Sequence, residues 1–219
     1  MLKKSAILFF GYFIVMILGS GLLMPFMSII TANFVVSMLL LLFAVILFKD
    51  HLAAEWDRFR AETPNFGRFF GKLIGYYFIM LLLRIAAITV LDQFMDTSTL
   101  GQNQEYLNEA AQNMSMLANV LLLTIYAPVV EELVFREAMM GPWKKNNKYV
   151  LIGSTIFSAF LFTYMHSFEW ADFALYLPIT IVLTKIYWEY DRNVIPGMLF
   201  HFVNNMIALA MMYLLFAIA

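Results

Sequence analysis

Thr124-Ile-Tyr-Ala-Pro-Val-Val-Glu131-Glu132-Leu-Val-Phe-Arg136-Glu-Ala-Met-Met140 is the stretch that decides the fold, because it places charged residues within an apolar, membrane-length segment. Each charged side chain at the centre of a spanning helix costs roughly 2.5–3.5 kcal/mol on insertion scales. Glu132 and Arg136 are four residues apart, so they can neutralise each other on one helix face. Glu131 is one residue out of that register and has no partner within the motif. Its carboxylate is therefore available for chemistry.

The composition of the whole chain is that of an integral membrane protein. Of its 219 residues, 63% are hydrophobic and 13% are charged, with a mean hydropathy of +0.78, whereas soluble domains are close to half apolar and a quarter charged. The chain has no cysteine, which excludes disulfides, thiolate metal sites and a cysteine nucleophile. No repeat or soluble domain is recognisable, and nothing points to nucleic acid. We expect one membrane domain over residues 1–219.

The spacing of polar segments predicts an all-α bundle of about seven transmembrane helices. Ser5 to Phe48 contains no Asp, Glu, Lys, Arg or His; as one helix it would measure about 66 Å against a hydrocarbon core of about 30 Å, so it must fold back once. The break is expected between Pro25 and Asn33. The later spans are expected at Leu73–Leu91, from Met116 through the opening stretch, at Tyr149–His166, from about Asp172 to Tyr190, and at Gly197–Ala219. Between them we expect an interfacial connector at Lys49–Lys72, a polar loop at Asp92–Asn113 and a basic turn at Gly141–Lys148.

The distribution of charge predicts the orientation of the bundle. With seven spans, all but two of the 14 lysines and arginines fall on one side of the membrane, and the charged residues of the opposite loops are all acidic. By the positive-inside rule the N-terminus is cytoplasmic and the C-terminus external. The two exceptions, Arg84 and Arg136, lie within spans. We expect a multi-pass protein of a cell membrane, specifically a bacterial plasma membrane.

Two of the three histidines lie in predicted spans, each with a companion one helical turn away. Phe162 precedes His166, and His201 precedes Asn205, with Asn204 beside it. A single histidine or asparagine in a membrane helix is more often a packing residue that bonds between helices. Several ionisable groups that converge with an unpaired glutamate indicate a functional site. The third histidine, His51, lies in the predicted connector and is expected to be solvated.

The three charged or polar patterns, in this order, resemble the motifs of one protein family. They are Glu131-Glu132-x-x-x-Arg136, Phe162-x-x-x-His166 and His201-x-x-x-Asn205. Together they are similar to the motifs of the CPBP family, the CAAX-prenyl-protease and bacteriocin-processing (Abi) intramembrane proteases, and here to its prokaryotic branch. The resemblance covers residues 116–210.

The resemblance implies an endopeptidase, a hydrolase that acts on membrane-associated peptides or proteins within the lipid bilayer. Carried onto this chain, it makes Glu131 the general base and His166 its partner in activating a water. His201 and Asn205 would stabilise the oxyanion of the tetrahedral intermediate, while Glu132 and Arg136 would hold the helix. Phe162 and Asn204 would be supporting residues. No prenyl-recognition element is evident in the sequence.

A role for metal stays open at this point. Glu131, His166 and His201 are the residue types of a two-histidine, one-carboxylate zinc site of the metalloprotease kind. There is no His-Glu-x-x-His element, however, and the histidines belong to separate spans. The sequence therefore favours a metal-free glutamate mechanism, with a divalent metal such as zinc as the alternative.

Two other functions fit a membrane bundle with buried charges. The first is a non-catalytic membrane protein of the same fold, such as a bacteriocin-immunity or peptide-binding protein. The second is a small transporter that uses Glu131, Arg84 and the histidines. A transporter predicts internal repeats or broken helices in matching halves, which the sequence lacks, so it is the weaker alternative.

Overall fold

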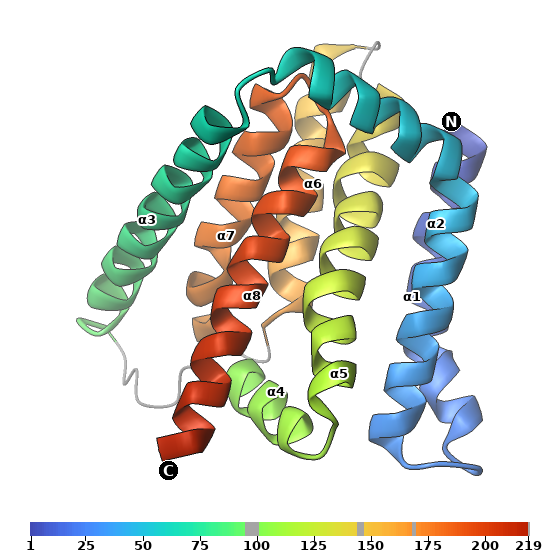
Figure 1. The fold of residues 1–219 in the computed structure, drawn as a ribbon, viewed down its shortest axis with the longest axis vertical. Helices are drawn as coiled ribbons and strands as arrows, with labels where there is room; N and C mark the ends of the chain where they lie inside the picture. The colour runs from blue at the N-terminus through green and yellow to red at the C-terminus, as the bar shows by residue number, and fades with distance from the viewer. Residues whose placement is uncertain (95–100, 144–146, 168–169, 219) are drawn as a thin grey trace.

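The protein is a bundle of long helices (Figure 1), described here from a computed structural model that covers residues 1–94, 101–143, 147–167 and 170–218. Within these ranges all regular elements are helical. They are α1 (Leu2–Leu23), α2 (Ile29–Glu62), α3 (Phe66–Leu91), α4 (Gln102–Gln112), α5 (Met116–Asn119), η1 (Val120–Ala138), η2 (Gly141–Trp143), α6 (Lys148–Met165), α7 (Trp170–Glu189) and α8 (Val194–Ile218).

The predicted all-α membrane bundle is confirmed. Among the described residues, six helical segments are long and apolar enough to cross a membrane, with α5, η1 and η2 forming one of them. The sixth predicted span is the 20-residue helix α7, which packs against α3, α6 and α8. The protein is therefore a multi-pass membrane protein.

The first two spans form an antiparallel hairpin, as the excess length of the charge-free segment predicts. α1 ends at Leu23 and α2 begins at Ile29, so the break lies at the start of the predicted interval. The Ser28 hydroxyl caps α2 by accepting a hydrogen bond from the backbone N–H of Thr31, at 3.2 Å. This cap satisfies one of the N–H groups that a helix start leaves without an intrahelical partner.

Two predicted connecting segments differ from the structure. The segment Lys49–Lys72 is not a separate element, because α2 continues to Glu62 and α3 begins at Phe66 after a three-residue turn. The segment Asp92–Asn113, expected to be a polar loop, contains the helix α4. α4 is polar and rich in glutamine, asparagine and alanine, so it lacks the apolar periodicity that identifies helices from sequence.

The start of α8 is tied to α2 through the tight turn that follows α7. Asp191 and Arg192 adopt left-handed backbone conformations there, with φ of 46° and 61°. Asn193 donates from Nδ2 to the carbonyl of Glu55 at 2.8 Å, and Arg58 donates to the carbonyl of Asp191 at 3.3 Å. These contacts fix α8, which carries His201, relative to the rest of the bundle.

The central helix of the bundle is η1, which contacts α1, α2, α6 and α8. Half of its span is buried, compared with 11% for α1 and α3. Its residues follow the wider π-helical pattern, in which each carbonyl bonds the N–H five residues ahead, and it contains Pro128. The opening charged stretch thus lies on the most enclosed helix of the protein.

The two ends of the bundle differ in character. The N-terminus, the α2–α3 turn and the α7–α8 turn lie at one end, while α4 and the C-terminus lie at the other (Figure 1). The first end carries the basic residues of α2 and the turns, as the alternation of spans predicts. Lys144 and Lys145 of the basic turn lie outside the described residues.

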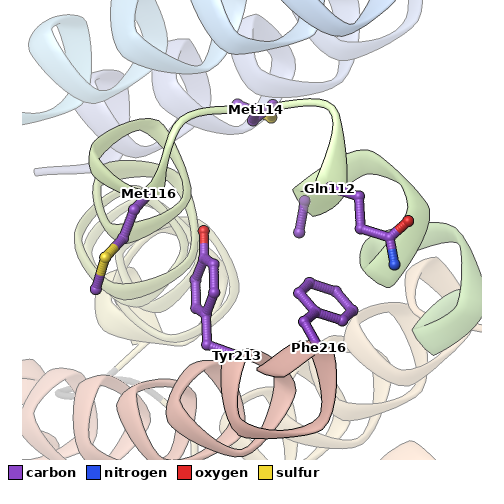
Figure 2. Close-up of a pocket in the computed structure, with 6 residues that line it drawn as sticks. Gln112, Met114, Met116, Tyr213 and Phe216 are labelled. Atoms are coloured by element: carbon purple, nitrogen blue, oxygen red, sulfur yellow. The ribbon is translucent and has the colours of Figure 1, made fainter. Parts of the chain in front are cut away.

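An open pocket of about 430 Å³ lies at the C-terminal end of the bundle, between α4, α5 and α8 (Figure 2). It is lined by Ala111, Gln112, Met114, Met116, Tyr213 and Phe216. Beside it, Asn119 donates to the carbonyl of Ala111 at 2.9 Å and to the hydroxyl of Tyr213 at 2.8 Å, which joins the three helices. None of the converging ionisable residues lines this pocket, so we place the candidate site elsewhere.

Candidate active site

Glu131 lies at the point where three helices meet. It is on η1 and only 8% exposed. Its Oε2 atom is 3.6 Å from Nε2 of His166 at the end of α6 and 3.9 Å from Nε2 of His201 on α8. The structure therefore brings together the three residues that the sequence singled out. These separations are slightly longer than that of a direct hydrogen bond.

The protonation of His166 is set by the backbone. Its Nδ1 atom is 2.7 Å from the carbonyl oxygen of Phe162, one turn earlier on α6. Because a carbonyl only accepts, Nδ1 must carry the hydrogen. In the neutral imidazole Nε2 then presents its lone pair to Glu131. His166 and Glu131 can therefore share a single proton, which is the property of an acid–base pair.

His201 is oriented by the second glutamate of the motif. Its Nδ1 atom is 3.2 Å from Oε1 of Glu132, and the same oxygen is 3.3 Å from NH1 of Arg136. The Glu132–Arg136 pair that the spacing predicts is thus present, with both side chains about 1% exposed. Glu132 also has a role beyond this pair, because it accepts from His201 and so fixes which imidazole nitrogen faces Glu131.

Phe162 separates the charged pair from the first histidine. The guanidinium carbon of Arg136 lies 4.3 Å from the centre of the Phe162 ring, a cation–π contact. The His166 ring lies 4.5 Å from the same ring, and the His201 ring meets it edge-on at 6.1 Å. Phe162 is 2% exposed. Its buried ring therefore packs against three of the ionisable residues and fixes their spacing.

The two asparagines of α8 form a short chain of hydrogen bonds. Asn205 donates from Nδ2 to the carbonyl of Leu123 on η1 at 2.8 Å. Asn204 donates from Nδ2 to Oδ1 of Asn205 at 3.0 Å. Asn205 thus connects α8 to η1 and is held in turn by the supporting residue Asn204, and Asn205 has a second amide hydrogen for another acceptor.

The approach of α8 to η1 depends on a glycine. A Cβ atom placed on Gly197 would lie 3.0 Å from Oε2 of Glu132. Most real Cβ contacts are longer, so a side chain here would push against the carboxylate that orients His201. Gly197 was not identified from the sequence, because nothing in its neighbourhood distinguishes it from other glycines in apolar helices.

The prediction that His51 is solvated is wrong. It lies on α2 with a side chain that is 20% exposed, and its Nε2 is 3.1 Å from Oε1 of the fully buried Glu137. Tyr187 of α7 donates its hydroxyl to Oε2 of Glu137 at 3.2 Å. Sequence reasoning left Glu137 without a role, although a further carboxylate in the apolar stretch was a sign that it needed a partner.

Arg84 does not join the site. It is an exposed residue of α3, a helix that packs mainly against α7 (Figure 1). No ion pair joins Arg84 to any residue in the described ranges. The transporter alternative, which used Arg84 together with Glu131, loses one of its proposed elements.

The metal alternative concerns Glu131, His166 and His201. Among the described residues, no group of three or more His, Asp or Glu side chains has the geometry of a metal site. Nε2 of each of the two histidines lies near the same carboxylate oxygen of Glu131, and Nδ1 of each lies near an acceptor of the protein. This arrangement also suits hydrogen bonding to a water or substrate without a metal.

Comparison with known proteins agrees with the motif pattern. Residues 113–207 match the sequence model of a family described as Rce1-like, type II CAAX prenyl endopeptidase. The UPF0177 protein YajF of Lactococcus lactis subsp. lactis (strain IL1403) is 28% identical over 162 residues, which cover 72% of this chain and 74% of that protein. No solved structure matches the fold. The family match spans all three motifs and the residues that meet at Glu131, so this part of the chain is similar to the Rce1-like type II CAAX prenyl endopeptidases.

Proposed function

We propose that this protein is an intramembrane endopeptidase that hydrolyses membrane-associated peptides or proteins with a water activated by Glu131 and His166. The observation that carries the proposal is that one buried Glu131 oxygen lies 3.6 Å from Nε2 of His166 and 3.9 Å from Nε2 of His201. Glu131 is held close to His166, whose Nδ1 hydrogen is already bonded to the carbonyl of Phe162. A glutamate in this position is suited to accept a proton from water.

The contacts of His201 support it as a donor to the oxyanion. Its Nδ1 atom lies 3.2 Å from Oε1 of Glu132, and its Nε2 atom lies 3.9 Å from Oε2 of Glu131. Both ring nitrogens of His201 therefore face carboxylate oxygens, which only accept hydrogen bonds when ionised. In the mechanism that we propose, Nε2 of His201 carries a hydrogen and is a donor that faces the same space as Glu131.

The reaction follows from these assignments. The oxygen of water attacks the carbonyl carbon of the scissile peptide bond, and the proton of the water passes to the Glu131–His166 pair. His201 and Asn205 donate to the oxyanion of the tetrahedral intermediate, where fixed donors in a water-poor site are most effective. When the carbon–nitrogen bond breaks, the pair returns its proton to the departing amine. The steps require no metal, and we expect exhaustive chelation to leave the rate of cleavage unchanged.

The proposal is tested by comparing peptides in membranes of cells that express the wild type, Glu131→Ala or Glu105→Ala. Glu105 is an exposed residue of α4, far along the chain from the site, so its variant controls for loss of one carboxylate. We expect products that occur with the wild type and with Glu105→Ala and disappear with Glu131→Ala at equal protein abundance. Identical profiles from all three strains would favour a non-catalytic, peptide-binding protein of the same fold.

A further inference from the structure

The π-helical pattern of η1 pairs one carbonyl with a residue that has no N–H. In the π-helical pattern of this segment the carbonyl of Leu123 would accept from the N–H five residues later. That residue is Pro128, which has no N–H. Within the hydrocarbon region no water is available to satisfy a backbone group that lacks a partner. The Leu123 carbonyl therefore needs a donor from outside its own helix.

Asn205 provides this donor. Its Nδ2 atom is 2.8 Å from the Leu123 oxygen, while its Oδ1 accepts from Nδ2 of Asn204 at 3.0 Å. Because the Leu123 carbonyl can only accept, the amide orientation of Asn205 is fixed, and the bond from Asn204 supports the same orientation. One Nδ2 hydrogen is used by Leu123 and the other stays available.

We propose that Pro128 is a positioning residue for Asn205. By removing one N–H from η1, the proline leaves the Leu123 carbonyl as an anchor that holds the Asn205 amide with its second hydrogen free for the substrate oxyanion. The inference rests on the proposed function, since Asn205 acts on an oxyanion there. Proline usually disrupts a helix. Here we assign Pro128 a further role, which is to position a side chain of a neighbouring helix.

The substitution Pro128→Ala tests this role because it restores the missing N–H. The new donor competes for the Leu123 carbonyl, so Asn205 loses its anchor and its amide becomes free to turn. Helix formation itself is not harmed, because alanine is the best helix former and proline the worst. Pro178→Ala is the matched control. It also removes a proline from inside a helix, α7, but no bond of Asn205 depends on that position.

The first measurement follows the amide directly, in purified ¹⁵N-labelled protein, with the Asn205 side-chain signal assigned by its loss in Asn205→Ala. We expect the Asn205 Nδ2 hydrogen that bonds Leu123, which gives a signal separate from that of the free Nδ2 hydrogen, to exchange at least about tenfold faster in Pro128→Ala than in the wild type or Pro178→Ala, because its protecting bond is lost. Unchanged exchange in Pro128→Ala would overturn the inference, whatever the activity of the variant.

The second measurement is the rate of cleavage. Because the donor acts in the transition state, we expect kcat of Pro128→Ala to fall about tenfold with KM within about twofold, less than the 10²–10³ typical of removing such a donor completely. Added to Asn205→Ala, the substitution should cause no further loss; a further loss would contradict the anchor. If the wild type cleaves nothing, the proposed function fails, while the exchange measurement still decides whether Pro128 positions Asn205.

Discussion

At the scale of single residues, Glu132 connects Arg136 of η1 to His201 of α8. Its Oε1 atom is shared by Arg136 on the same helix and His201 on another. The carboxylate is fully buried, and Arg136 is 1% exposed. Breaking a buried ion pair by removing one partner leaves an uncompensated charge and typically costs 3–5 kcal/mol.

Arg136→Ala should therefore lower the stability of the protein by about 3–5 kcal/mol, measured by thermal unfolding in detergent and by abundance in the membrane. Adding Glu132→Ala removes the stranded carboxylate and should recover part of the loss. Arg68→Ala, at an exposed position of α3, is the control and should be neutral. A stable but inactive Arg136→Ala would instead place Arg136 in the chemistry.

The sequence predicts residues of the site where a local pattern and a physical cost coincide. Glu131 stood out because it is charged, in an apolar span, and out of register with Arg136. The companion histidines stood out because ionisable residues are rare in spans. The pair of His51 and Glu137 was missed because its members are on different helices and neither is marked by spacing. Long-range partners of this kind become evident only when the helices are placed.

At the scale of helices, the site depends on the close approach of α8 to η1. Gly197→Ala would bring a Cβ to 3.0 Å from Oε2 of Glu132, and overpacking of this kind typically costs about 1–3 kcal/mol. We expect a lower melting temperature and slower cleavage, because Glu132 orients His201. Gly153→Ala on α6 meets nothing within 4 Å and should be neutral or slightly stabilising. Equal behaviour of the two variants would show that the helix approach does not depend on Gly197.

The sequence predicts the long apolar helices and not their details. Hydrophobic length identifies spans regardless of whether the backbone is α- or π-helical, so the form of η1 could not be anticipated. Pro128 was visible in the opening stretch, but its consequence depends on a carbonyl of η1 and an amide of α8. α4 was missed because a short polar helix at the end of a bundle carries no periodic apolar signal.

At the scale of the whole molecule, the orientation in the membrane is a prediction from the basic residues. The chain has no native cysteine, so single cysteines can report sidedness with an impermeant thiol reagent. Pro64 is exposed in the α2–α3 turn, and Asn113 is exposed after α4, at the opposite end of the bundle (Figure 1). Asn113→Cys should react in intact cells and Pro64→Cys only after lysis. The opposite pattern would place the basic end outside.

The measurement that tests the central claim most directly is the cleavage rate of purified Glu131→Gln on a peptide identified from wild-type membranes. Glutamine keeps the size and polarity of the side chain and removes its ability to take a proton. We predict an unchanged melting temperature and a loss of kcat of about 10²–10⁴, the usual contribution of a general base, while Glu105→Gln keeps wild-type activity. Cleavage at the normal rate by folded Glu131→Gln would contradict the assignment of Glu131 as the residue that activates water.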